Sequence, residues 1–265
     1  MIETSNITGE RINEYLSQKK RFDSRKLEDF REIIIEKGIL KNADGSARVK
    51  LGKTEVLVGI KMGVDAPYPD SQDKGNLITS TELSPLSSAR FEENGRIDEA
   101  IELERIVDRG IRESKFIDMK KLCIKEGEKV WTVFIDIYPI NDDGNLIDAA
   151  GIGAVVALKN AKMPKYDKEE EKVLYGELTK ENLPLSDEIP LLITIHRIGD
   201  NLVVDPTREE EIVSETRVSV CSFNGIIFAV QKGNSGELNL EEMDKILKVI
   251  EKTERELFGK IQKFI

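Results

Sequence analysis

The alternation of apolar and polar residues predicts β-strands through much of the chain. In the first half, β-branched runs are interrupted by Asp44-Gly45 and Gly52-Lys53, turn sequences typical of antiparallel hairpins. The strands predicted there lie within residues 31–40, 47–62, 75–85 and 130–138. In the second half they lie within 189–198, 201–206, 215–223 and 225–233.

Four segments are predicted to be helices. Residues 9–19 and 98–114 place apolar side chains at the period of an amphipathic helix. Residues 148–164 are rich in small side chains, which suits a helix packed closely against a sheet, and Pro164 should end it. A long closing helix is predicted over residues 239–264.

Strands followed by a helix occur twice along the chain. This order predicts an α+β fold of two similar strand-plus-helix halves that share one layered core. A stretch rich in Lys and Glu separates the halves and is expected to be a connector with no more than one short strand. The predicted parts are an N-terminal helical arm (1–20), the first half (21–164), the charged connector (165–188) and the second half with its closing helix (189–265).

The composition favours a globular protein with an acidic surface. The chain has 265 residues, of which 39% are hydrophobic and 34% charged, and its formal net charge is -10. Such a protein does not coat nucleic acid or anionic membrane through its overall field, so any contact with nucleic acid must come from a local basic patch. There is no signal-peptide pattern and no apolar stretch of about 18 residues, so we expect a cytoplasmic protein without a membrane partner.

Few residues suit metal binding or nucleophilic catalysis. Cys123 and Cys221 lie far apart in strand-like runs, and His196 is the only histidine, so no familiar zinc-binding spacing is present. Neither cysteine has an adjacent basic residue to activate its thiolate. We therefore predict no metal site, no cofactor, two reduced core thiols and a structural histidine.

Residues 201–220 form an acidic cluster that could hold a metal or act in acid/base chemistry, but the cluster contains a cation. Strand alternation would place Arg217 on the same face as Glu215, beside any carboxylate pocket. The cluster is therefore either an active site or the remains of one.

Five stretches, in this order, resemble the RNase PH-like phosphorolytic exoribonucleases over residues 21–256. They are RFDSRKLEDFREI, DGSARVKLGKTEVLVGIK, ELERIVDRGIRESK, DDGNLIDAAGIGAVVAL and LVVDPTREEEIVSETRVSV. The chain is most similar to the non-catalytic type of subunit in archaeal exosomes. This resemblance implies an RNase PH-like fold and a hexameric ring, a trimer of heterodimers, in which the chain alternates with a catalytic paralogue. It also implies RNA-binding cap subunits and single-stranded RNA as partners.

Residues that carry the chemistry of active members are altered in this chain. Their phosphate-binding turn has a hydroxyl and an arginine where this chain has Leu146 and Ile147. Aliphatic side chains cannot make such charge-assisted contacts, which are worth about 1.5–3 kcal/mol. Their two aspartates fall on Glu211 and Arg217, and a cation at the second position repels a divalent ion. We predict no catalytic residue, and an ion pair of Arg217 with Glu215 or Glu211.

The R-x-D-G-R motif that opens the active members is retained except for its glycine. Arg21, Asp23 and Arg25 are present, and Ser24 replaces the glycine. The change weakens the argument for a tight turn at this point without deciding the function.

The predicted helix at 98–114 has a basic face. Arg105, Arg109 and Arg112 lie opposite its apolar side, at a spacing that suits successive phosphates of single-stranded RNA. The carboxylates that could neutralise them instead, as on a solvated helix face, are Glu102, Asp108 and Glu113. The resemblance implies that the non-catalytic subunit lends arginines of this helix to RNA entering its neighbour's site. It favours Arg105 and Arg109 as RNA-binding residues and, less strongly, Arg112.

The expected function is that of a non-catalytic subunit. It completes the ring and helps to bind single-stranded RNA for the phosphorolytic 3′-to-5′ exoribonuclease site of a catalytic paralogue. Two alternatives remain open at this point. One is an active phosphate-dependent exoribonuclease, and the other is a purely architectural scaffold without RNA contact.

Overall fold

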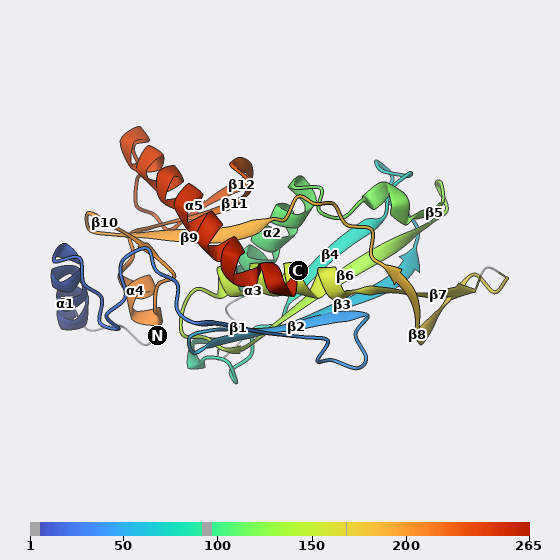
Figure 1. Cartoon of the computed structure of the whole chain (residues 1–265), viewed down its shortest axis with the longest axis horizontal. Coiled ribbons are helices and arrows are strands. Elements are labelled where there is room, and N and C mark those ends of the chain that lie inside the picture. Colours follow the sequence, from blue (N-terminus) through green and yellow to red (C-terminus); the bar gives the residue numbers. More distant parts are fainter. Residues whose placement is uncertain (1–5, 92–96, 168) are drawn as a thin grey trace.

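The chain folds into two large β-sheets with two helices between them, a long helix on the far side of the second sheet, and a separate two-stranded sheet (Figure 1). The computed structural model describes residues 6–91, 97–167 and 169–265. The helices are α1 (Asn6–Ser17), α2 (Ile97–Glu113), α3 (Leu146–Asn160), α4 (Arg208–Val213) and α5 (Leu240–Ile261), with short 3-10 helices η1 (Ala89–Phe91), η2 (Met119–Leu122) and η3 (Gln262–Phe264). One continuous apolar core contains residues of both halves. The predicted α+β fold is confirmed.

The first sheet is built by the first half of the chain. Its order is β1-β2-β3-β6-β4, with β5 paired to β6 outside this path. All neighbours are antiparallel except β4 and β6, which are parallel. The strands are β1 (Ile33–Lys37), β2 (Gly45–Leu51), β3 (Thr54–Asp65), β4 (Asn76–Thr81), β5 (Cys123–Lys125) and β6 (Lys129–Asn141).

The second sheet is antiparallel and belongs to the second half. Its strands, in spatial order, are β10 (Asn201–Val204), β9 (Leu191–Ile198), β11 (Thr216–Phe223) and β12 (Ile226–Gly233). The register places Arg217 of β11 between His196 of β9 and Gly233 of β12. Arg217 is therefore flanked on both sides by residues of the same sheet.

Helix α3 approaches both sheets because it carries a glycine toward each of them. A Cβ atom at Gly151 would lie 2.8 Å from the side chain of Leu192 in the second sheet. One at Gly153 would lie 2.6 Å from the side chain of Val58 in the first sheet. The small residues of α3 therefore allow close packing against both sheets, as the sequence predicted for one.

The remaining helices cover the outside of the second half. Helix α5 begins with a capping box, in which the side chain of Asn239 accepts a hydrogen bond from the backbone N–H of Glu242 at 2.9 Å. Helix α1 buries Ile12 and Leu16 against Ile198 in a small separate cluster. The first five residues of the predicted arm lie outside the described residues. No described helix is long and apolar enough to cross a membrane.

Two boundaries differ from the sequence-based prediction. Helix α3 ends at Asn160 rather than at Pro164, because a proline and the residue before it disfavour the helical conformation. The expected connector instead contains most of a hairpin of two strands, β7 (Lys162–Asp167) and β8 (Lys172–Asn182). Its strands mix charged residues, Pro164 and Gly176 with the apolar residues, so they lack the regular apolar alternation that reveals a strand. The division of the chain into domains at this stretch stays a prediction.

A buried carboxylate joins the two halves beside the turn that starts α3. Asp205 is fully buried and accepts hydrogen bonds from Arg25, Arg31 and the side chain of Asn145, at 2.7–2.9 Å. A charge without water needs such partners, because burying an unpaired carboxylate is costly. The network fixes the N-terminal segment and the turn before α3 to the second sheet.

Ser24 adopts the left-handed backbone conformation, with φ of 66°. We expect Ser24→Gly to stabilise the protein, because a side chain in this conformation costs about 1–2 kcal/mol and the extra freedom of glycine in the unfolded chain offsets only about 0.5–1 kcal/mol. The melting temperature should rise by about 1–4 °C, measured by calorimetry. Ser24→Ala is the matched control, and an equal rise in that variant would contradict the explanation.

Candidate functional site

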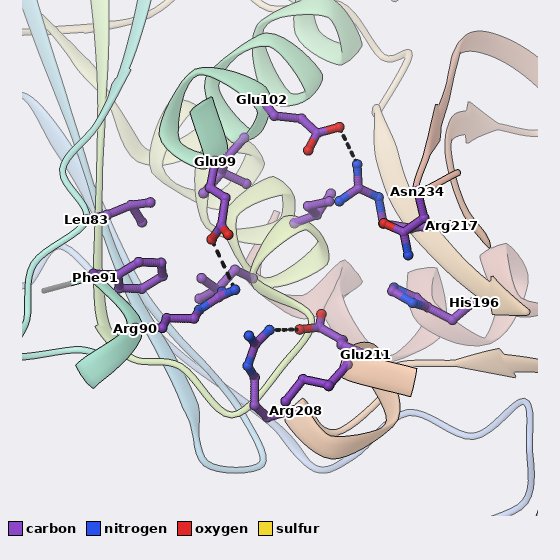
Figure 2. A pocket seen from close by; sticks show the side chains of 14 residues that line it. Leu83, Arg90, Phe91, Glu99, Glu102, His196, Arg208, Glu211, Arg217 and Asn234 are labelled. Atoms are coloured by element: carbon purple, nitrogen blue, oxygen red, sulfur yellow. Dashed lines mark hydrogen bonds and ion pairs between the residues drawn. The ribbon is translucent and has the colours of Figure 1, made fainter. Parts of the chain in front are cut away.

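A cleft of about 290 Å³ opens between the first turns of α2 and α3, helix α4 and the facing strands β9 and β11 (Figure 2). Its walls include Leu146, Ile147, Glu211 and Arg217, the four residues expected from the resemblance to stand in place of the phosphate-binding and acidic groups of active exoribonucleases. Leu146 and Ile147 are distant in sequence from Glu211 and Arg217, and the fold brings all four to one cleft. Two cleft arginines that the sequence analysis did not single out, Arg90 and Arg208, also line it.

Each arginine lining the cleft within the described part of the chain is paired with a carboxylate of the same chain, as Figure 2 shows for three of the contacts. The pairs are Arg90–Glu99 (3.0 Å), Arg90–Asp142 (2.7 Å), Arg208–Glu211 (3.1 Å) and Arg217–Glu102 (2.5 Å). An entering phosphate would have to displace these carboxylates while meeting their negative charge. Carboxylates of the same chain therefore balance the positive charges of the cleft, although its space remains open.

The N-terminus of α3, where a phosphate would be expected in active relatives, already has an anion. Asn145 precedes the helix in a left-handed conformation, and its backbone N–H donates to the carboxylate of Glu211 at 2.7 Å. Burial raises the pKa of Glu211, while this hydrogen bond and the charge of Arg208 favour its ionised form. Leu146 and Ile147 add no donor from their side chains. The chain's own carboxylate thus occupies the end of the helix dipole.

The predicted partners of Arg217 were wrong. Its guanidinium pairs with Glu102 on α2, whereas Glu215 lies just before β11 and approaches Arg197 at 3.7 Å. Strand alternation applies only inside a strand, and β11 begins at Thr216. Glu211, the other predicted partner, pairs with Arg208 instead.

His196 is neutral at physiological pH. It is 3% exposed, and burial together with the charge of Arg217 lowers its pKa to about 3. Neither ring nitrogen has a hydrogen-bond partner among the described residues. A histidine with this pKa cannot exchange protons near neutral pH, so it fits a structural role better than a catalytic one.

The side chains of the cleft do not fit a divalent ion. Glu211 is engaged by Asn145 and Arg208, and the second position of the expected acidic pair is the cation Arg217. Across the described residues, no group of three or more His, Cys, Asp or Glu side chains is arranged for a metal. Cys221 is buried, which raises its pKa to about 12 and leaves the thiol protonated.

The three arginines predicted from the sequence lie on α2 around a second, shallow hollow. Arg105 and Arg109 are exposed, and Arg109 donates to Gln231 of β12 at 3.2 Å. Arg112 is more constrained, because it pairs with Asp108 at 2.9 Å and donates to a backbone carbonyl. Arg105 has no hydrogen bond or ion pair with a described residue. The hollow thus offers two exposed guanidiniums without a carboxylate partner among the described residues, and one that is already paired.

Comparison with known proteins agrees with the fold. Residues 29–164 match domain 1 of the 3′ exoribonuclease family, RNase PH, and residues 188–251 match domain 2. The chain belongs to this family.

The relatives include proteins described as exosome complex component Rrp42. The chain is 46% identical to the one from Thermococcus onnurineus, covering 90% of this chain and 88% of the relative, and 40% identical to the one from Methanothermobacter thermautotrophicus, covering 92% and 90%. A solved structure titled as the Archaeoglobus fulgidus exosome with RNA bound to the active site matches with 39% identity and a TM-score of 0.86, covering 97% of this chain and 98% of that one. A chain of an archaeal exosome core matches with 37% identity and a TM-score of 0.84, covering 98% and 96%.

Asp148, in the first turn of α3, is a titratable residue whose environment the sequence did not reveal. Its carboxylate is fully buried and accepts hydrogen bonds from Asn145 at 3.0 Å and from the backbone of Thr194 at 3.1 Å. Burial outweighs these bonds and raises the pKa of Asp148 to about 7. An acidic residue inside an otherwise apolar, small-residue helix was the available signal.

The raised pKa of Asp148 should make the free energy of unfolding fall as the pH increases. Between about pH 4 and pH 7 the folded state binds a proton that the unfolded state has lost, so stability decreases by up to about 1.4 kcal/mol per pH unit. Asp148→Asn cannot titrate and should lack this component. In urea unfolding, we expect the free energy of unfolding of the variant, relative to that of the wild type, to increase from pH 5 to pH 7. Above pH 8 the difference between the two proteins should be constant.

The wild type has to be compared with the Asp148→Asn variant because His196 changes the stability with pH in the opposite direction. Its lowered pKa destabilises the folded state as the pH falls below about 6.5, in both proteins alike. A difference between the two proteins that does not change with pH would refute the assignment to Asp148.

Proposed function

We propose that this chain is the non-catalytic RNase PH-like subunit of an archaeal exosome core. It completes a hexameric ring with a catalytic paralogue and helps to bind the single-stranded RNA that the paralogue degrades from the 3′ end with phosphate. The observation that carries this proposal is the cleft in which every lining arginine of the described chain is neutralised by an internal carboxylate.

The cleft argues against the alternative of an active exoribonuclease. Electrostatic stabilisation of developing charge is usually a large term in catalysis, and losing one such group costs about 10² to 10³ in rate. Here Ile147 replaces a phosphate-binding arginine, and the cation Arg217 replaces an aspartate. Glu211 additionally occupies the helix N-terminus that would face the phosphate.

The basic face of α2 supports a role in RNA binding over that of a purely architectural scaffold. Arg105 and Arg109 are exposed and uncommitted to any carboxylate of the described chain, so they can contact phosphates by charge and donor geometry. Arg112 would have to leave Asp108 to do so and is the weakest of the three predicted contacts. Such contacts with phosphates do not require recognition of the bases.

The assembly that we propose is the one implied by the resemblance of the sequence to subunits of this type. The chain would alternate with the catalytic paralogue as a trimer of heterodimers, and cap subunits with RNA-binding domains would sit on the ring. RNA then meets only the inner surface, so a net charge of -10 on the whole chain is compatible with RNA binding.

Replacing both Arg105 and Arg109 by alanine in the assembled complex should weaken binding of single-stranded RNA. Each lost phosphate contact lowers the log-log dependence of affinity on salt by about 0.7, so the slope should fall by up to about 1.4. Fluorescence anisotropy over a series of salt concentrations measures it. Lys248→Ala with Arg255→Ala on α5 removes the same charge from an exposed surface and should leave the slope unchanged. Equal slopes for all three complexes would favour a scaffold without RNA contact.

The isolated chain should not shorten RNA in the presence of phosphate, whereas the complex with the catalytic paralogue should. A gel assay of a labelled single-stranded RNA with and without phosphate distinguishes the two. Phosphate-dependent shortening by the isolated chain that is lost in Glu211→Ala would show that this cleft has its own activity and would overturn the proposal.

A further inference from the structure

Arg105 has no ion pair with a described residue, although two carboxylates lie within reach along the same helix. Glu102 is three residues before it and Asp108 three residues after it, and residues at this spacing are neighbours on a helix surface. Oppositely charged side chains at this spacing commonly pair. That neither carboxylate pairs with Arg105 requires an explanation.

Each of these carboxylates is held by another arginine. Glu102 is bound by Arg217 of β11 at 2.5 Å, and Figure 2 shows its side chain turned toward that strand. Asp108 is bound by Arg112 at 2.9 Å, within α2 itself. These two carboxylates beside Arg105 are thus engaged elsewhere, and neither occupies its guanidinium.

The surroundings of Arg217 fix its guanidinium in the position that binds Glu102. Arg217 lies between His196 and Gly233 in the sheet, and its side chain is only 15% exposed. A Cβ atom at Gly233 would lie 2.4 Å from Nη2 of Arg217, so this position provides the space for the guanidinium. His196 is neutral and does not offer a competing negative charge.

We propose that Arg217 is a positioning residue for RNA, which holds the carboxylate of Glu102 away from Arg105 and so keeps Arg105 available for a phosphate group. The inference rests on the proposed role of Arg105 in RNA binding. Without Arg217, Glu102 pairs with Arg105 along the helix, and RNA has to displace that carboxylate before it binds. Arg217, whose charge would repel a divalent ion in the cleft, thereby keeps an arginine of α2 available for RNA.

The test is binding of single-stranded RNA to the assembled complex without phosphate, measured by anisotropy over a series of salt concentrations. Arg217→Ala should weaken binding about three- to tenfold at low salt and lower the salt slope by up to about 0.7, the share of one phosphate contact. Adding Glu102→Gln to Arg217→Ala should restore binding, because residue 102 then has no carboxylate to occupy Arg105 and Asp108 remains paired with Arg112.

Matched variants separate this role from other effects of the ion pair. Arg217→Ala with Glu256→Gln on α5 has the same net charge as the rescued variant and should stay weak, which excludes an effect of total charge. Glu102→Gln alone should bind RNA at least as tightly as the wild type. If the pair only stabilised the fold, Glu102→Gln would impair binding as much as Arg217→Ala does.

The arrangement also predicts that Arg217 acts through Arg105. In an Arg105→Ala background, Arg217→Ala should cause no further loss of RNA affinity. Failure of Glu102→Gln to rescue, or an equal loss in that background, would overturn the inference and point to a direct contact of Arg217 with RNA. If Arg105→Ala by itself leaves the RNA affinity unchanged, the proposed contact of Arg105 with RNA is wrong, and the role of Arg217 is wrong with it. If Arg105→Ala weakens binding but Arg217→Ala does not, only the present inference fails.

Discussion

The buried carboxylate of Asp205 is the interaction on which the arrangement of this protein depends. It accepts hydrogen bonds from Arg25 and Arg31 of the N-terminal segment and from Asn145 at the start of α3. A neighbouring buried pair, Arg21 with Glu210, ties the same segment to α4. Removing one partner from such a network leaves a buried charge unpaired, which is costly. The relative positions of α3, α4 and the second sheet, and hence the shape of the cleft, follow from this network.

The cleft between these elements has lost its chemistry through charge pairing rather than through collapse. A cavity of about 290 Å³ remains, but its cations and carboxylates satisfy one another. Two of the residues that make it inactive have structural roles, since Glu211 binds the N-terminus of α3 and Arg217 binds α2. An inactive site of this kind can retain its fold because each arginine that lines it among the described residues has a carboxylate partner.

The residues that exclude catalysis could be identified from the sequence, but their partners could not. Ile147 and Arg217 have side chains whose chemistry is wrong for phosphate and for a divalent ion wherever they point. The partner of Arg217 was predicted among nearby acidic residues, and the structure places it at Glu102, far away in sequence. The raised pKa of Asp148 was likewise invisible, because it results from burial between α3 and β9 rather than from neighbours in the chain.

The sequence by itself determined the α+β class, most of the strands and helices, and the loss of the catalytic groups. Those features depend on local periodicity and on the identity of single side chains. Only the tertiary structure decided that the Lys- and Glu-rich stretch forms the hairpin of β7 and β8, and which carboxylate neutralises each arginine. Ion pairs depend on distances of a few ångströms between residues brought together by packing, and no local pattern in the chain specifies those distances.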